Sequence, residues 1–206
     1  MVEAATAETG QPPAEQTQPD LACPGVGRDG RHHPPGETVL FGPGADLAGA
    51  FVQSGETVFG SDPDPRAILP LDGLRVSRSL RQRINRGGFE VRFNAAFREV
   101  MEACAAPGPG REETWISKEL IDLYSEVHDL GYAHSVEVWI DNSLVGGLYG
   151  VAIGRFFAGE SMFSCVTDAS KIALVALVER LQETDAALLD IQFMTDHLKR
   201  LGAVEI

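Results

Sequence analysis

The stretch His134–Ile153, HSVEVWIDNSLVGGLYGVAI, decides the fold class of this 206-residue chain. Its first seven residues alternate between two faces, which predicts a strand with the two valines and the isoleucine on one side. Asp141-Asn142 has the turn chemistry of a hairpin, and Leu144–Ile153 predicts a returning strand interrupted by glycines. We therefore expect an antiparallel hairpin.

Upstream of the hairpin, the pattern predicts one more strand and two helices. Phe89–Phe93 alternates and predicts a strand, after which Asn94 can cap a helix. Apolar residues recur along that helix at helical spacing: Phe97, Val100, Met101 and Cys104. Ser117 is expected to cap a second helix, which Gly131 ends.

Downstream of the hairpin, strands and helices continue to mix. Phe156–Ala158 predicts the start of a strand, and Gly159–Ser164 (GESMFS) is expected to be a loop before the next helix. Thr167 or Asp168 can cap that helix, and Ala187–Phe193 predicts a final apolar strand. This order, with antiparallel pairing, predicts an α+β domain.

Two segments of this part of the chain carry polar groups that could do chemistry. Asp190 and Gln192 interrupt the apolar strand and share one side-chain direction, and a buried carboxylate there needs partners. They could serve a neighbouring loop structurally or act in catalysis. The GESMFS segment offers a carboxylate and two hydroxyls, and is either a polar connector or part of a site.

Composition divides the chain into three parts. Residues 1–36 are rich in Pro, Gly and Gln and poor in branched aliphatic residues, so we expect a disordered acidic tail. Residues 37–66 are more apolar but glycine-punctuated and predict a small N-terminal lobe, followed by a main domain at 67–206. No run of eighteen apolar residues and no signal segment occurs, which predicts a cytoplasmic protein without a membrane partner.

The formal net charge of −13 hides a strong asymmetry. Residues 61–100 sum to +3, whereas residues 1–60 sum to −6 and residues 101–206 to −10. Five arginines fall within twelve residues without an intervening acid: Arg75, Arg78, Arg81, Arg83 and Arg86. This cluster is the candidate site for a polyanion, although a solvated basic face would have the same composition.

Several common sites are not indicated by the sequence. It contains no GxxxxGK[ST] phosphate loop, and Gly146–Gly150 fails the dinucleotide pattern because it lies within a predicted strand. The three cysteines form no CxxC pair, and no metal-ligand spacing occurs. We therefore predict neither a metal nor a cofactor.

A series of blocks in this sequence resembles one known family, the leucyl/phenylalanyl-tRNA–protein transferases. The resemblance is collinear from about Pro63 to Ile206. The blocks are PDPRAILPL (Pro63–Leu71), SRSLR (Ser77–Arg81), TWIS (Thr114–Ser117), LGYAHSVEVW (Leu130–Trp139), LVGGLYGVA (Leu144–Ala152), GESMFS, DASK (Asp168–Lys171), LLDIQ (Leu188–Gln192) and LGAVEI (Leu201–Ile206).

The resemblance implies a fold and an activity. The fold is a mixed sheet with flanking helices, similar to that of the GNAT acetyltransferases. The activity is transfer of Leu or Phe, less readily Met, from aminoacyl-tRNA to proteins with N-terminal Arg or Lys, which marks them for N-degron degradation. No cofactor is implied, and family members act as monomers. The chain lacks the [QR]-x-x-G-x-[GA] loop that holds coenzyme A in acetyltransferases.

The resemblance also assigns roles to residues of this chain. Gln192, oriented and polarised by Asp190, matches the pair that activates the incoming amine, and Glu160 matches a carboxylate near the adenosine and aminoacyl end. The Arg cluster matches the stretch that holds the tRNA acceptor stem through its backbone. Candidate substrate-binding residues by position are Trp115, Leu148, Phe157, Met162, Ser164 and Leu189. For the apolar ones, ordinary core packing is an equal alternative, and Leu189 should point away from Asp190.

The chain also departs from the family pattern at both ends. The family's N-terminal motifs have only a faint counterpart in Gly44–Phe51, and Gly60-Ser61 stands where two aromatic residues are expected. The usual C-terminal extension beyond Ile206 is absent from this sequence. Two alternatives therefore stand beside the active transferase: an impaired relative that binds charged tRNA or basic N-termini, and an acyltransferase with another donor such as coenzyme A.

Overall fold

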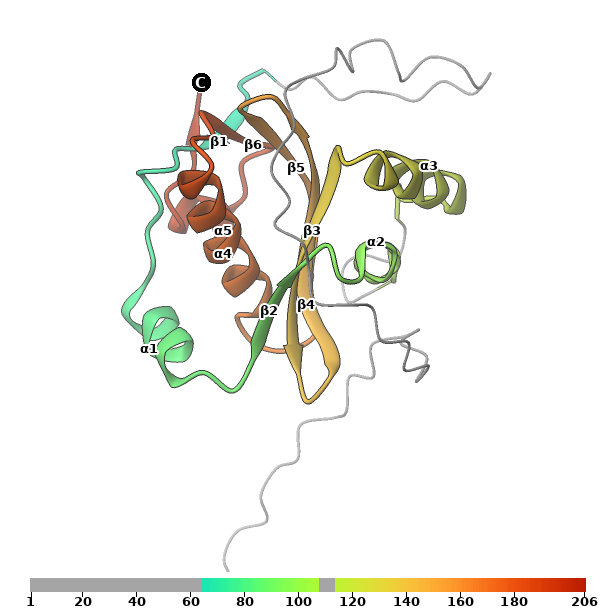
Figure 1. Cartoon of the computed structure of the whole chain (residues 1–206). Helices are drawn as coiled ribbons and strands as arrows, with labels where there is room; N and C mark the ends of the chain where they lie inside the picture. Colours follow the sequence, from blue (N-terminus) through green and yellow to red (C-terminus); the bar gives the residue numbers. More distant parts are fainter. Residues whose placement is uncertain (1–63, 108–113) are drawn as a thin grey trace, which may run out of the picture.

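A computed structural model describes residues 64–107 and 114–206, which form a seven-stranded mixed sheet with helices on both faces (Figure 1). The strand order is β2-β3-β4-β5-β6-β1-β7. The strands are β1 (Ala67–Leu69), β2 (Glu90–Phe93), β3 (Ala133–Ile140), β4 (Ser143–Ile153), β5 (Phe156–Ser164), β6 (Leu188–Gln192) and β7 (Val204–Glu205). The helices are α1 (Arg78–Arg86), α2 (Phe97–Ala105), α3 (Lys118–Asp129), α4 (Ala169–Glu183) and α5 (Asp196–Arg200). The expected α+β, GNAT-like mixed sheet is confirmed.

The hairpin predicted from His134–Ile153 forms β3 and β4, the second and third strands of the sheet. Asp141 and Asn142 make the turn with φ of 49° and 60°, the left-handed values that the favoured two-residue hairpin turn requires. The glycines of β4 allow close packing, because a Cβ on Gly146 would lie 2.4 Å from the Cβ of Ala169. The hairpin therefore lets α4 pack directly on the sheet.

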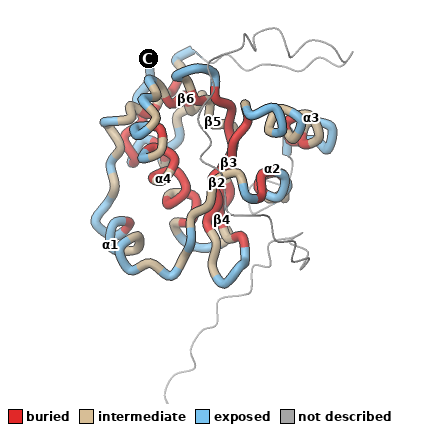
Figure 2. The backbone as a smooth tube through the Cα atoms, viewed as in Figure 1, coloured by how far each residue is buried: buried red, intermediate tan, exposed pale blue. Residues whose placement is uncertain are grey.

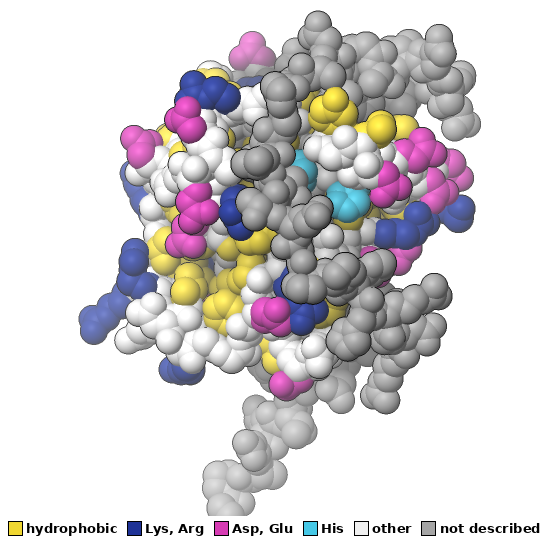
Figure 3. All heavy atoms as spheres, viewed as in Figure 1, with side chains coloured by type: hydrophobic (Ala, Val, Ile, Leu, Met, Phe, Trp, Pro, Cys, Tyr) yellow, Lys and Arg dark blue, Asp and Glu magenta, His cyan; other side chains and the backbone are white. Residues whose placement is uncertain are grey.

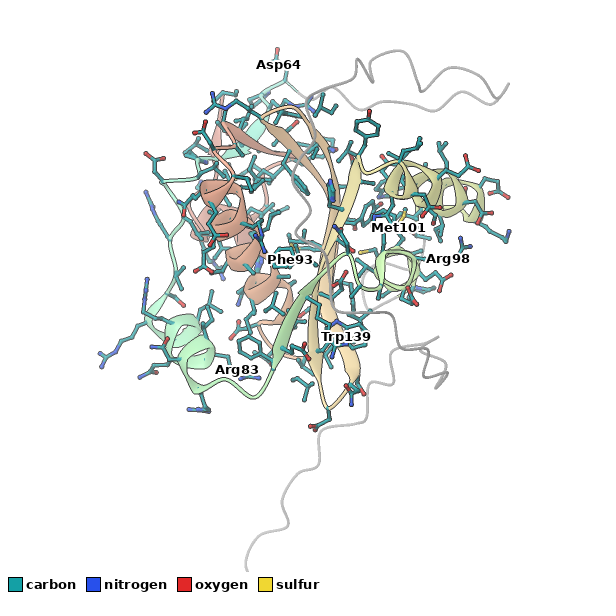
Figure 4. All side chains as sticks on the ribbon, viewed as in Figure 1. Asp64, Arg83, Phe93, Arg98, Met101 and Trp139 are labelled. Atoms are coloured by element: carbon teal, nitrogen blue, oxygen red, sulfur yellow. The ribbon has the colours of Figure 1, made fainter. Side chains whose placement is uncertain are left out.

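The two faces of the sheet are covered by different helices. α4 packs on β3, β4 and β5 from one side, with α1 and α5 also on that side, whereas α2 and α3 cover the other (Figure 1). β3, β4 and α4 are largely buried, while α1 is mostly exposed (Figure 2). The labelled side chains follow this division: Arg83 lies on the α4 side, and Arg98 and Met101 on the α2 side (Figure 4).

Two of the expected helix caps differ from the prediction. Ser117 does cap α3, accepting from the Leu120 N–H. Asn94 does not cap α2; it has φ 56°, and its side-chain oxygen instead accepts the Ser135 N–H at 3.0 Å. Asp168 lies at the start of α4 but has φ 68° and makes no capping bond, because its carboxylate pairs with Lys171.

The expected loop at Gly159–Ser164 is instead the second half of β5. β4 pairs with β5 along this whole length, and the register shifts once, so that Tyr149 faces Ser161 and Gly150 faces Gly159. Glu160 is the extra residue of this β-bulge. A bulge is difficult to predict from the sequence because it breaks the two-residue period that identifies a strand.

The pairing of β5 with β6 ends before either strand does. These two strands are parallel, and their ladder runs only from Phe156–Leu188 to Ala158–Asp190. β5 then continues to Ser164 and β6 to Gln192 without pairing to each other. The strands therefore separate at Glu160 and Gln192.

The described residues bear on only part of the expected domain plan. The predicted tail, 1–36, and all but the last three residues of the predicted lobe, 37–66, lie outside them. Within 64–107 and 114–206, no helix is both long and apolar enough to cross a bilayer.

Candidate active site

The polar residues expected to carry chemistry meet where β5 and β6 separate. Glu160 comes from the bulge of β5, and Asp190 and Gln192 from the end of β6. The Gln192 amide nitrogen lies 3.3 Å from Oε2 of Glu160. Segments about thirty residues apart in sequence thus supply one cluster.

Asp190 is buried and fully engaged by hydrogen-bond donors. Its side chain is 2% exposed, and its Oδ2 accepts from the Arg66 Nε at 2.8 Å and lies 2.7 Å from an Arg66 terminal nitrogen. Its Oδ1 accepts the backbone N–H of Gln192 at 2.9 Å. Asp190 thus contacts the main chain of Gln192, and the Gln192 amide group reaches Glu160 instead.

Gln192 reaches Glu160 through an irregular backbone. In the pairing of β1 with β6, Ile68 faces Asp190 and Ala67 faces Gln192, so that Ile191 is an extra residue. Gln192 itself has φ 62°, in the left-handed region. The strand alternation from which a common direction of Asp190 and Gln192 was expected is therefore interrupted at Ile191, and Asp190 bonds the Gln192 main chain instead.

The surroundings of Glu160 stabilise its protonated form relative to the same side chain in water. Burial raises its pKa above the usual value and the nearby Asp190 adds to this, while hydrogen bonds from Gln192 and Tyr124 and the charge of Arg66 act in the opposite direction. Burial also raises the pKa of Tyr124 and of Tyr149, which remain neutral phenols. The site thus holds a carboxylate with a raised pKa beside two phenols and the Arg66–Asp190 pair.

Four of the candidate substrate-binding residues lie together on the α4 face. Leu148 pairs with Met162 across β4 and β5, and Phe157 pairs with Leu189 across β5 and β6. Leu148, Phe157 and Leu189 are at most 3% exposed and belong to the core beneath α4, with Met162 packed against it. As expected, Leu189 lies on the opposite face from Asp190, and the Phe157–Leu189 pair immediately precedes the last pair of the ladder, Ala158–Asp190.

The other two candidate substrate-binding residues lie elsewhere. Trp115 precedes α3 and is 60% exposed. Ser164 ends β5, where its hydroxyl donates to the Val166 carbonyl and accepts the Ser170 N–H. The structure therefore shows Ser164 in the connection to α4 and leaves its substrate role a prediction.

The Arg cluster lies on and beside α1. Leu80 and Ile84 attach the helix to the core, while Arg75, Arg78, Arg81 and Arg86 are exposed and form no ion pair with any residue of 64–107 or 114–206. Figure 3 shows basic side chains projecting on this side of the molecule.

Arg83 differs from the other members of the cluster. It donates to the Gly87 carbonyl at 2.6 Å and stacks over Phe89, 5.3 Å from the ring centroid. These contacts give Arg83 a role in holding the end of α1, and they leave four arginines directed to solvent.

Two residues that contact the Glu160, Asp190 and Gln192 group were not predicted from the sequence. Arg66 stood in a quoted block without a role, and its partner Asp190 is 124 positions away. Tyr124 was expected on the buried face of a helix, where it lies, but its hydroxyl also meets Glu160. No local pattern signals either contact. In the described part of the chain, no group of three His, Cys, Asp or Glu residues could hold a metal ion.

Comparisons with known proteins show which family the chain is similar to. Residues 68–206 match a family described as leucyl/phenylalanyl-tRNA protein transferase. A protein named leucyl/phenylalanyl-tRNA–protein transferase from Herpetosiphon aurantiacus is 57% identical over 150 residues, covering 72% of this chain and 76% of that protein. Its namesake from Rhodospirillum rubrum is 56% identical over 145 residues, covering 70% and 68%.

Solved structures show a weaker likeness. The L-PGS structure from Bacillus licheniformis has a TM-score of 0.46 and 12% identity, covering 64% of this chain and 47% of that one. A Bacteroides thetaiotaomicron protein of unknown function has a TM-score of 0.46 and 13% identity, covering 68% and 55%.

Proposed function

The chain belongs to the leucyl/phenylalanyl-tRNA protein transferase family, and from this premise we propose that it transfers Leu, Phe or Met from aminoacyl-tRNA to proteins that begin with Arg or Lys. The product would carry a destabilising N-terminus and enter the N-degron pathway in the cytoplasm. The observation that carries the proposal is the meeting of Glu160, Gln192 and Asp190 where β5 and β6 separate.

The chemistry needs little beyond alignment and a route for one proton. The aminoacyl ester is already activated, so the acceptor α-amine must be held against the carbonyl carbon. An amide bond forms, the ester bond to the ribose oxygen breaks, and the amine proton moves to that oxygen. A site with one hydrogen-bond acceptor for the amine and one carboxylate for the proton is sufficient.

Gln192 and Glu160 fit these two tasks. A carboxylate can only accept, so the Gln192 NH₂ group faces Glu160 and its carbonyl oxygen is directed elsewhere. That oxygen can accept a hydrogen bond from the acceptor amine and orient its lone pair. Glu160, with its raised pKa, is suited to take the proton and return it to the leaving oxygen.

The apolar and basic features fit the donor. The Phe157–Leu189 pair immediately precedes the end of the β5–β6 ladder, so the apolar cluster of Leu148, Phe157, Met162 and Leu189 lies next to this point and would supply a dry wall for an apolar side chain. Each methylene there would discriminate by only about 1–3 kcal/mol, consistent with a preference for several large apolar residues. The exposed arginines of α1 would hold the acceptor stem by its phosphates.

A label-transfer assay tests the proposal. Purified protein is incubated with radiolabelled Leu-tRNA or Phe-tRNA and a peptide starting with Arg, and with a matched peptide starting with Glu as the control. We expect label only on the Arg peptide. No transfer, with tRNA still retained on a filter, would instead identify a binding protein; acyl transfer from acyl-coenzyme A would identify a different donor.

A further inference from the structure

We propose that Arg66 is the positioning residue of this site: its guanidinium holds the Asp190 carboxylate in place, and Asp190 thereby sets the conformation of Gln192. The inference rests on the proposed function, because it assigns the part of the site that orients the amine-binding amide. It begins from the contacts of Arg66 Nε and a terminal nitrogen with Oδ2 of Asp190, at 2.8 and 2.7 Å.

The first step concerns the charge of Asp190. A carboxylate with 2% exposure is costly to bury unless donors occupy its oxygens. Arg66 supplies two of these donors, both at Oδ2, from a guanidinium whose planar shape suits such contacts. Because Oδ1 accepts from Gln192 as well, we assign the amine proton to Glu160 and not to Asp190.

The second step concerns Gln192. Asp190 Oδ1 accepts the Gln192 backbone N–H, two residues on, while Gln192 has φ 62°. A non-glycine residue rarely adopts this conformation, and the hydrogen bond that the Gln192 N–H donates to the carboxylate offsets its cost. The left-handed backbone in turn carries the Gln192 amide to Glu160. Arg66 thus acts on Gln192 through Asp190.

The third step separates this role from ordinary strand pairing. Arg66 uses its own backbone to pair with Ile206 in both directions, at 3.2 and 2.9 Å. β1 joins β6 through the backbones of Ala67, Ile68 and Leu69. The sheet therefore does not need the guanidinium to join its edge strands, and the side chain is available for the site.

The test compares Arg66→Ala and Arg66→Lys with the wild type in single-turnover transfer from Phe-tRNA to an Arg-starting peptide, between pH 5.5 and 9. Arg92→Ala is the matched control, because Arg92 is also 33% exposed and also pairs with a carboxylate, at Glu90. We expect Arg66→Ala to transfer about 100-fold more slowly, with tRNA retention within about twofold of wild type.

The pH profile distinguishes positioning from a structural role. Beside this profile, rescue is the deciding readout, because the proposed role needs donors at the Asp190 carboxylate. Arg66→Lys should keep more of the rate than Arg66→Ala, and added guanidinium ion should restore part of the rate of Arg66→Ala while changing neither Arg92→Ala nor the wild type.

Each outcome decides one way. No transfer by the wild type would overturn the proposed function itself. Wild-type transfer with an equal rate for Arg66→Ala would overturn the role of Arg66 alone. If Arg66→Ala does not fold, the decision passes to Arg66→Lys, which cannot supply both contacts to Asp190 Oδ2: slower transfer with tRNA still retained supports the proposal, and a wild-type rate contradicts it.

Discussion

Both faces of the sheet are packed on an apolar core, but only one of the two also buries carboxylates. On the α4 face, Leu148, Phe157 and Leu189 belong to a core of aliphatic and aromatic groups. The α2 and α3 face has a second apolar core, and Glu137 and Asp190 are buried on that face as well, each bonded by hydrogen-bond donors. These donors offset the cost of burying the two carboxyl groups.

The difference matters because carboxylates are costly to bury. Glu137 accepts from the Ser135 hydroxyl at 2.5 Å and from the N–H groups of Ala95 and Ala96, at the start of α2. It therefore holds the two residues that lead into α2, whose N-cap position has no side-chain capping bond. On this face, one buried carboxyl group fixes the approach to a helix and another, Asp190, bonds within the candidate site.

Asp190→Ala is expected to have the largest effect. Transfer should fall by about 1,000-fold or more, because Gln192 loses the acceptor that fixes its backbone, while tRNA retention is unchanged. Transfer and filter retention are measured on the same preparation. Asp185→Ala is the control, because Asp185 also pairs with an arginine, Arg155, at an exposed site. Equal loss of transfer and retention would contradict the role of Asp190.

Phe157→Ala tests the other face. Phe157 is 1% exposed, and deleting its ring leaves a cavity beneath α4, so the free energy of unfolding should fall by about 3–5 kcal/mol. Urea unfolding measures this loss. A fall of less than about 1 kcal/mol would show that Phe157 lines an open pocket and not a packed core.

Glu137→Gln tests the cost of a buried carboxylate. Burial raises the pKa of Glu137 to about 7 from an ordinary 4.5, so between these pH values the folded chain retains a proton that the unfolded chain has lost. Stability from this group should therefore decrease as pH rises from 4.5 to 7, by on the order of 3 kcal/mol, and the variant should lack that decrease.

The measured quantity is the difference in unfolding free energy between Glu137→Gln and wild type at each pH. The difference is needed because His134, with its pKa lowered to about 4 by burial, contributes the opposite trend below pH 6.5. Parallel curves for the two proteins would show that Glu137 stays ionised.

The Arg78→Glu, Arg81→Glu double variant is expected to have the smallest effect per residue and extends the comparison to exposed cations. Retention of tRNA should weaken about tenfold or more for every aminoacyl group, and its dependence on salt should become shallower. Filter binding over a range of salt concentrations measures both. An Arg98→Glu variant is the control, because Arg98 already pairs with Glu102 and Asp122; equal weakening would mean that α1 is not the contact.

Local patterns predicted the elements well and the contacts between them poorly. The hairpin at Asp141-Asn142 and the cap at Ser117 follow from turn and capping chemistry, which acts within a few residues. The bulge at Glu160 and the bend at Gln192 break strand periodicity, so their effect on the site was not visible. Arg66 was not predicted because its partner, Asp190, lies near the other end of the domain in sequence.

The bulge in β5 means that Glu160 could be removed without changing the pairing of its neighbours. Glu160 is the one residue of β5 without a partner on β4, so its deletion would give an uninterrupted ladder in which Ser161 follows Gly159. The same scaffold can therefore exist with or without this acid through a single-residue insertion or deletion. Gain or loss of this carboxylate among related sheets would then appear in a sequence alignment as a one-residue gap and not as a substitution.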